Sequence, residues 1–313
     1  MKTKLKRAAQ TVVKNLLSIK KKENTVIVTD KVCRAVADAL MNAAQEITDP
    51  ILVEIVPRHI HGEEPPPLVA DILKQCDVFI IPTSRSLSHT QARINACRRG
   101  ARGATMPGIT VTMMERTLNV DYRRIKKLTL RLARLLSGAR NAVIQTQSGT
   151  LKLDLTGRKG HADTGIIKQP GDFSNLPAGE AYIAPLELKS AGTITIDGSF
   201  ASVGLLKQSI TIQLDRGRIR NLRGNQRLST LFAQYGRKER TLCELGIGTN
   251  LEAKVTGNVL EDEKALGTVH VAFGNNLGFG GKNNGKIHLD GVVRRPNLWI
   301  DGTQIIKKGR FIF

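Results

Sequence analysis

The chain has 313 residues, a formal net charge of +21 and a hydrophobic fraction of 41%. This length suits two domains or one large domain, and the hydrophobic fraction predicts buried cores rather than disorder. No apolar run approaches the roughly 18 residues that a membrane helix needs. We therefore expect no membrane partner.

The net charge indicates which partners to expect, and the cysteine spacing indicates the redox compartment. Lys and Arg number 48 against 27 Asp and Glu, a balance that can indicate nucleic-acid binding. The excess is spread along the chain, however, and aromatics make up only 4% of residues. We expect attraction to polyanions at low salt but no specific nucleic-acid partner. None of the four cysteines forms a C-x-x-C pair, which favours reduced thiols in a cytoplasmic protein.

Two sequence patterns follow one another along the chain. Up to residue 142, short β-branched runs at 24–30, 51–56 and 77–84 alternate with segments of helical spacing. This alternation predicts an α/β domain, residues 1–142, with a mostly parallel sheet. From residue 143 onward, short alternating runs are separated by glycines. This second pattern predicts a β-rich α+β domain, residues 143–313, which we expect to be catalytic.

Potential metal ligands gather near the C-terminus. His288 and Asp290 are two residues apart, so on an extended strand both side chains point to one face and can reach one metal ion. Glu244, Glu263 and His270 would complete such a site, and imidazole with carboxylate suits zinc, manganese, cobalt or iron. Spacing alone also allows acids that cap turns and histidines that pack in a core.

Several segments resemble one known family. The motifs NLPAGEAYIAP, ELGIGTN, EDEKALGTVHVAFGNN and IHLDGVV, with EEPPP, SLSHT and TMPGIT nearer the N-terminus, are similar to those of the thermophilic metalloaminopeptidases, which include aminopeptidases T and S. The resemblance covers nearly the whole chain. It implies an N-terminal α/β domain, a β-rich catalytic domain, a cytoplasmic homodimer and two divalent metal ions, namely zinc, cobalt or manganese.

The resemblance also implies roles for single residues. Carried over by motif, the metal ligands fall on Glu180, Glu244, His270, His288 and Asp290. On spacing alone, Glu180 is no different from an ordinary solvated acid. Glu263 matches an acid close to the site and is expected to act as a general base or to support the ligands, and Glu244 is expected to take part in catalysis. The implied function is an aminopeptidase-like hydrolase that releases N-terminal residues from peptides through a water activated by two metal ions, so the expected partner is a peptide or small-molecule substrate.

Three observations keep alternatives open. Leu277 stands where the aminopeptidases carry a tyrosine, and leucine cannot stabilise an oxyanion. A related branch of the same fold resembles extradiol-type dioxygenases, which open dihydroxypyridine rings with non-haem Fe(II). There a histidine stands at the position of Glu244 and counterparts of Glu180 and His270 are absent, although His270, His288 and Asp290 would still give two histidines and one carboxylate for iron. The high charge leaves, third, a nucleic-acid-associated protein with a vestigial site.

Overall fold

The computed structural model describes residues 3–313, which divide into two compact units. The first unit runs to Tyr122 and takes in Gly165–Ala178, and the second comprises Arg123–Thr164 and Gly179–Phe313. No helix of the described residues is long and apolar enough to cross a membrane. The division differs from the single boundary expected after residue 142, because the long helix α6 (Tyr122–Gly138) buries its apolar side chains in the core of the second unit.

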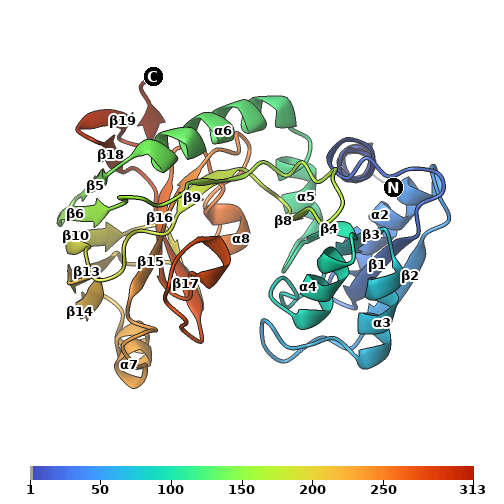
Figure 1. The fold of residues 1–313 in the computed structure, drawn as a ribbon, viewed down its shortest axis with the longest axis horizontal. Coiled ribbons are helices and arrows are strands. Elements are labelled where there is room, and N and C mark those ends of the chain that lie inside the picture. The colour runs from blue at the N-terminus through green and yellow to red at the C-terminus, as the bar shows by residue number, and fades with distance from the viewer. Residues whose placement is uncertain (1–2) are drawn as a thin grey trace. The chain divides into compact units, whose positions relative to one another are not determined.

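The first unit is a five-stranded parallel sheet in the order β2-β1-β3-β4-β8. Every residue of β1 and of β3 is buried, as expected of parallel strands covered on both faces. Helices α3 and α4 pack together on one face, and α1, α2 and α5 pack together on the other (Figure 1). The strands are β1 (Thr25–Asp30), β2 (Ile51–Ile55), β3 (Val78–Ile81), β4 (Arg102–Thr105) and β8 (Phe173–Asn175). The helices are α1 (Thr3–Gln10), the π-helix η1 (Thr11–Leu16), α2 (Arg34–Gln45), α3 (Pro67–Gln75), α4 (Gln91–Arg98) and α5 (Val111–Thr117).

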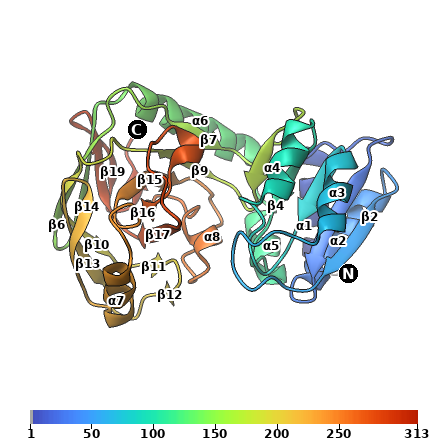
Figure 2. The same cartoon turned by 60° about the horizontal axis from the view of Figure 1, so that its bottom comes forward.

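The second unit contains two antiparallel sheets, in the orders β14-β13-β10-β6-β5-β18-β19-β20 and β12-β11-β17-β16-β15-β9-β7. Figure 2 shows β14, β13 and β10 side by side at one edge of this unit. The strands of the eight-stranded sheet are β5 (Asn141–Thr146), β6 (Gly149–Asp154), β10 (Ala191–Ile196), β13 (Ile210–Asp215), β14 (Arg218–Arg223), β18 (Asn297–Ile300), β19 (Thr303–Lys307) and β20 (Arg310–Phe311).

The seven-stranded sheet positions the candidate site. Its strands are β7 (His161–Asp163), β9 (Glu180–Ile183), β11 (Ser199–Phe200), β12 (Gly204–Leu205), β15 (Leu242–Gly248), β16 (Val269–Gly274) and β17 (His288–Val293). The remaining elements of the unit are α7 (Gln226–Gln234), α8 (Val259–Asp262) and the 3-10 turn η2 (Leu277–Phe279). The predicted fold class, an α/β unit with a parallel sheet followed by a β-rich unit, is confirmed.

The core of the second unit lies between its two sheets. Strands β6, β10 and β13 of one sheet and β9, β15 and β16 of the other contribute alternate side chains to a single hydrophobic cluster. In β15 and β16 these are Leu245, Ile247, Val269, Val271 and Phe273. Because side chains alternate along a strand, the residues between them point to the opposite face of the seven-stranded sheet.

Candidate metal centre

That opposite face carries the predicted ligands. Glu180 begins β9, Glu244 lies in β15, His270 lies in β16, and His288 and Asp290 lie in β17. Each is adjacent in its strand to a residue that packs in the hydrophobic core or against it. The sequence alternation that builds the core therefore also places all five side chains on one surface.

Small residues separate these side chains in the strand register. Gly246 is paired with His270, Ala272 with both Glu244 and Asp290, and Gly274 with His288. A Cβ atom at position 246 would lie 2.0 Å from Nε2 of His270. The imidazole thus lies directly over Gly246, and only glycine leaves room for it there.

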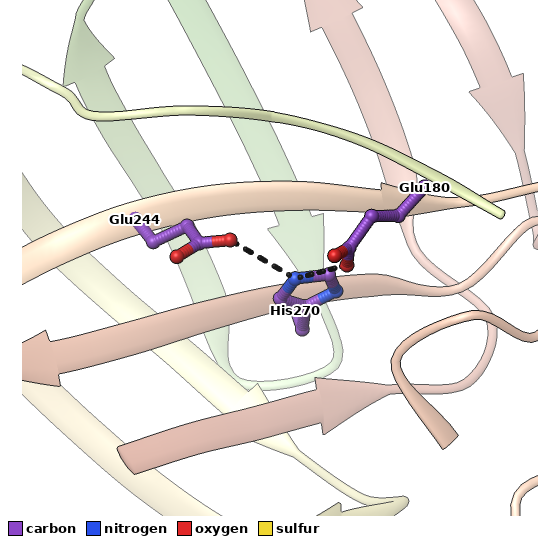
Figure 3. Close-up of side chains that lie close together, drawn as sticks. All are labelled: Glu180, Glu244 and His270. Atoms are coloured by element: carbon purple, nitrogen blue, oxygen red, sulfur yellow. Dashed lines mark ion pairs between the residues drawn. The ribbon is translucent and has the colours of Figure 1, made fainter. Parts of the chain in front are cut away.

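The five predicted ligands form a continuous cluster. Nε2 of His270 lies 3.2 Å from Oε2 of Glu180 and 3.5 Å from Oε1 of Glu244 (Figure 3). Nε2 of His288 lies 3.1 Å from Oε2 of Glu244 and 3.4 Å from Oδ1 of Asp290. Glu244 is therefore the side chain that joins the two histidines.

Within the described residues, three overlapping sets of donor atoms lie within 4.8 Å of one another: Glu180–Glu244–His270, Glu244–His288–Asp290 and Glu263–His270–Asp290. All six residues predicted for the site are members. Asp290 shares one set with each histidine, but no set contains both, so the structure does not gather His270, His288 and Asp290 into a single two-histidine triad.

The cluster is buried at one end and open at the other. The His270 side chain is 1% exposed, whereas that of His288 is 29% exposed. A ligand entering from solvent would therefore meet the Glu244–His288–Asp290 set first.

The spacing argument misses a buried lysine in the site. Lys264 follows the short helix α8, and its side chain is 1% exposed. Its Nζ donates to Glu180, lies 2.7 Å from Oε1 of Glu263 and lies 3.9 Å from Oδ2 of Asp163. The sequence signal was its place beside Glu263, but a lysine in an EDEK run is typical of a solvated turn. Lys264 holds a fixed positive charge at the closed end of the cluster.

The acids and histidines shift one another's pKa values. Burial acts to raise the pKa of Glu180, but Lys264 and His270 outweigh it and lower that pKa to about 2. Burial, opposed by Lys264 and reinforced by Glu180 and Asp290, raises the pKa of Glu263 to about 8. Burial acts to lower the pKa of His270, but Glu180 and Glu244 raise it well above its usual value. The carboxylates thus favour positive charge at the imidazoles, whether a proton or a metal ion supplies it.

His288 is oriented by the group on its far side. Its Nδ1–H donates to the backbone carbonyl of Asn275 at 2.8 Å, which leaves Nε2 to face Glu244 and Asp290. Such a bond fixes the tautomer and the ring of a metal-binding histidine. Cys243 also contacts Nδ1, at 3.7 Å, but burial raises the pKa of its thiol to about 11 despite His288, so it is a thiol at neutral pH.

Three aromatic rings lie beside the open end, and sequence reasoning missed them as a group. His161 and Tyr182 stack at 5.3 Å between ring centroids, on the same sheet face as the donors. Phe279 packs its edge against Tyr182 at 5.4 Å and contacts the His288 ring at 6.0 Å. Leu277, where the resemblance expects tyrosine, is 51% exposed. Phe279, two residues further along, is the ring that contacts the His288 imidazole.

A sequence model of one enzyme family, the 2,5-dihydroxypyridine 5,6-dioxygenases (NicX), matches residues 9–313. The chain belongs to this family. A comparison with curated protein sequences gave no match. The name of this family describes oxygenation of an aromatic ring and not cleavage of a peptide bond.

Two solved structures share the fold of this family member. The 2,5-dihydroxypyridine dioxygenase from Pseudomonas putida KT2440 is 17% identical with a TM-score of 0.80, and the match covers 98% of this chain and 96% of that one. Wild-type AmpT from Thermus thermophilus is 15% identical with a TM-score of 0.73, and the match covers 100% of both chains. At these identities the likeness shows the fold alone.

The family match overturns the main functional expectation. The prediction of an aminopeptidase-like hydrolase, a metalloprotease, is wrong, because the matching family is a dioxygenase family. The motifs behind that prediction lie largely in β9 and in β15–β17, elements of a fold that both solved structures share. They therefore identified the fold without distinguishing between its two enzyme branches.

Proposed function

We propose that the protein is a dioxygenase that opens a hydroxylated, nitrogen-containing aromatic ring and uses a single ferrous ion. The family match over residues 9–313 carries the proposal. Two features of the site support it. The donors are imidazole and carboxylate without a thiolate, which suits Fe(II), and aromatic rings lie beside them.

The Glu244–His288–Asp290 set would hold the ion, because it is the set nearest solvent. One observation fits a cation in this cluster: its four carboxylates, those of Glu180, Glu244, Glu263 and Asp290, outnumber the one buried ammonium, that of Lys264. Many ferrous oxygenases use two histidines and one carboxylate, so this chain's open set is richer in carboxylate. When bound, the ion would supply a common binding place for dioxygen and the ring hydroxyls.

The aromatic side chains would bind the substrate ring. Phe279 is partly exposed and touches the His288 ring with its edge. A flat ring bound near His288 would lie against Phe279, with the stacked pair Tyr182 and His161 holding Phe279 in place. Offset or edge contacts between aromatic rings are worth about 0.5–1.5 kcal/mol beyond simple burial.

Glu263 would exchange a proton with a ring hydroxyl. Its carboxylate lies in one donor set with Asp290, and it is held at 2.7 Å by Lys264 Nζ. Lys264 keeps its ammonium between Glu263 and Glu180. We infer that Lys264 positions Glu263 and balances charge, while Glu263 itself faces the substrate.

Oxygen uptake tests the proposal directly. The protein is purified without oxygen, loaded with Fe(II), and mixed with 2,5-dihydroxypyridine as the probe. We expect consumption of dioxygen in step with loss of the ring's ultraviolet absorbance. His288→Ala should reduce this uptake to background, because the variant removes the oriented imidazole of the open set.

A matched control separates loss of the site from loss of any histidine. His59 lies in the first unit, outside all three donor sets, so His59→Ala should leave oxygen uptake unchanged. Protein that binds one ferrous ion per chain yet consumes no oxygen with dihydroxypyridines would refute the proposed function.

A further inference from the structure

A cavity lies in the β-rich unit, and none of the metal donors lines it. Its volume is about 400 Å³, within the range typical of small-molecule sites. It lies between the start of β14 and the segment that follows α7. Four arginines line it, Arg218, Arg220, Arg237 and Arg240, together with Tyr235 and Ile219. None of the six residues of the metal centre contributes to its lining.

Backbone hydrogen bonds fix the floor of this cavity. The amide of Ile219 donates to the carbonyl of Arg240 at 3.0 Å, and Nη2 of Arg240 donates back to the carbonyl of Ile219 at 2.8 Å. The amide of Leu242 donates to Gly217 at 2.8 Å. The two segments that carry the arginines are therefore held together before any ligand binds.

The charge in the cavity is unbalanced. No carboxylate is among the side chains that line it, all of which belong to the described residues. Arg220 pairs with Asp215 at 2.9 Å, but both side chains are more than half exposed, so solvent screens that pair. Glu239 is the one carboxylate beside Gly236 of the lining, and its Oε1 accepts from the amide of Lys286 at 3.0 Å, so a single acid faces four guanidinium groups there.

The guanidinium groups gathered around this cavity repel one another. A single ligand carrying several acceptor oxygens would relieve that repulsion.

We propose that this cavity binds a small multivalent anion of the phosphate-ester class. The guanidinium group is planar and matches phosphate oxygens with two parallel hydrogen bonds, which is the recognition that arginine provides better than lysine. Tyr235 and Ile219 offer an apolar wall for the organic part of the ester. This site is separate from the proposed ring-cleaving centre and does not depend on it.

Calorimetric titration of the full chain at constant ionic strength tests the site. The probes are phenyl phosphate, inorganic pyrophosphate and inorganic phosphate. We expect saturable binding of one molecule per chain. Phenyl phosphate should bind more tightly than inorganic phosphate if the apolar wall contributes.

Two variants decide whether the cavity is responsible. Arg218→Gln should weaken binding by about tenfold or more, since it removes a charged donor. Arg223→Gln removes the same charge from an exposed position on the same strand, outside the lining, and should leave binding unchanged. Thermal melts of both variants confirm that each remains folded.

Three results would overturn the proposal. The first is the absence of saturable binding by any of the three probes. The second is equal weakening in both variants, and the third is binding to a DNA oligonucleotide alone that disappears at moderate salt. Either of the last two would assign the arginines to general polyanion attraction.

Discussion

The metal centre requires a residue without a side chain at position 246, which is Gly246. It is paired with His270 across β15 and β16, and an added Cβ would fall 2.0 Å from Nε2 of the imidazole. Since the His270 side chain is 1% exposed and packed on all sides, the ring has nowhere to move. We expect Gly246→Ala to displace His270 and, because Oε1 of Glu244 lies 3.5 Å from its Nε2, to disturb the Glu244–His288–Asp290 set and weaken metal binding and oxygen uptake.

A metal titration measures the affinity of the variant, and far-ultraviolet circular dichroism checks that the variant is folded. The control is Gly138→Ala, at the end of α6, where an added Cβ would meet nothing within 4 Å. Gly138→Ala should bind metal as the parent does. Normal metal affinity in Gly246→Ala would show that His270 is not needed to hold the ion.

Phe279 allows a second prediction about a single side chain. Replacing it with alanine removes the ring that touches His288 but no donor atom. We expect KM for a dihydroxypyridine to rise by about tenfold while Fe(II) affinity stays the same, because one lost ring contact is worth about 1 kcal/mol or slightly more. Leu277→Ala, at the exposed neighbour, is the matched control and should change neither value. Equal KM values in the two variants would place the substrate elsewhere.

Sequence reasoning at this scale succeeded where periodicity applied. The two-residue spacing of His288 and Asp290 correctly predicted a shared strand face, because both lie in β17 with Nε2 of His288 3.4 Å from Oδ1 of Asp290. Lys264 and the ring of His161 depend on contacts between distant strands and helices, which no local pattern reveals. Glu180 was found only through motif resemblance, for the same reason.

Among the elements, β4 is tied to the segment between η1 and β1 by one buried ion pair. Arg102 is 7% exposed; its Nη1 and Nη2 donate to Glu23, at 2.9 and 2.7 Å, while Nε donates to the carbonyl of Leu17 and Nη2 also donates to that of Ser18. Breaking such a pair leaves an uncompensated buried charge, so Arg102→Met should destabilise the first unit by about 3–5 kcal/mol. Lys14→Met, which breaks a pair with Glu46 between much more exposed side chains, should destabilise the unit far less, because solvent screens that pair. Urea unfolding followed by helical signal measures both, and similar effects would contradict the assigned burial.

The same pair sets a pH dependence. Burial acts to raise the pKa of Glu23, but the hydrogen bonds from Arg102 and the amide of Lys20 lower it overall. A carboxylate whose folded pKa lies below its unfolded value stabilises the fold above the unfolded pKa and loses that contribution as pH falls through the folded one. The stability difference between the parent and Glu23→Gln should therefore hold steady near neutral pH and shrink below about pH 4. Urea unfolding across that range measures it, and a difference that grows on acidification would reverse the assignment.

The order of elements was largely predictable, but the division between units was not. Buried β-branched runs such as β1 and β3 predicted the parallel sheet, and glycine-punctuated alternation predicted the β-rich unit. The expected cut after residue 142 missed two facts. The apolar side of α6 packs into the β-rich core, and the segment containing β8 returns to the first sheet beside β4. Both facts depend on which part of the chain, distant in sequence, an element packs against. The element's own sequence does not show this.

For the whole molecule, the division into two units means that metal binding involves the second unit, where the fluorescence of a single tryptophan can follow it. Every member of the three donor sets lies in the second unit, and so does the chain's one tryptophan, Trp299 in β18. A ligand that binds only the folded state stabilises it by about 2.7 kcal/mol at a hundredfold excess over its Kd. The homodimer and the cytoplasmic location stay predictions, and this test does not depend on either.

We expect saturating Mn(II), a redox-stable probe, to raise the midpoint of the Trp299 fluorescence transition by about 5–10 °C. The part of the helical circular-dichroism signal that comes from α1 to α5 of the first unit should not move, because that unit holds none of the donor sets, while the part from α6 should follow Trp299. His288→Ala should remove the shift in the tryptophan transition. A metal-induced shift confined to the helical signal would place the ion in the first unit and reject the centre built on the seven-stranded sheet. A shift of both signals together would instead mean that the two units unfold as one cooperative body, in which case the loss of that shift in His288→Ala becomes the deciding observation.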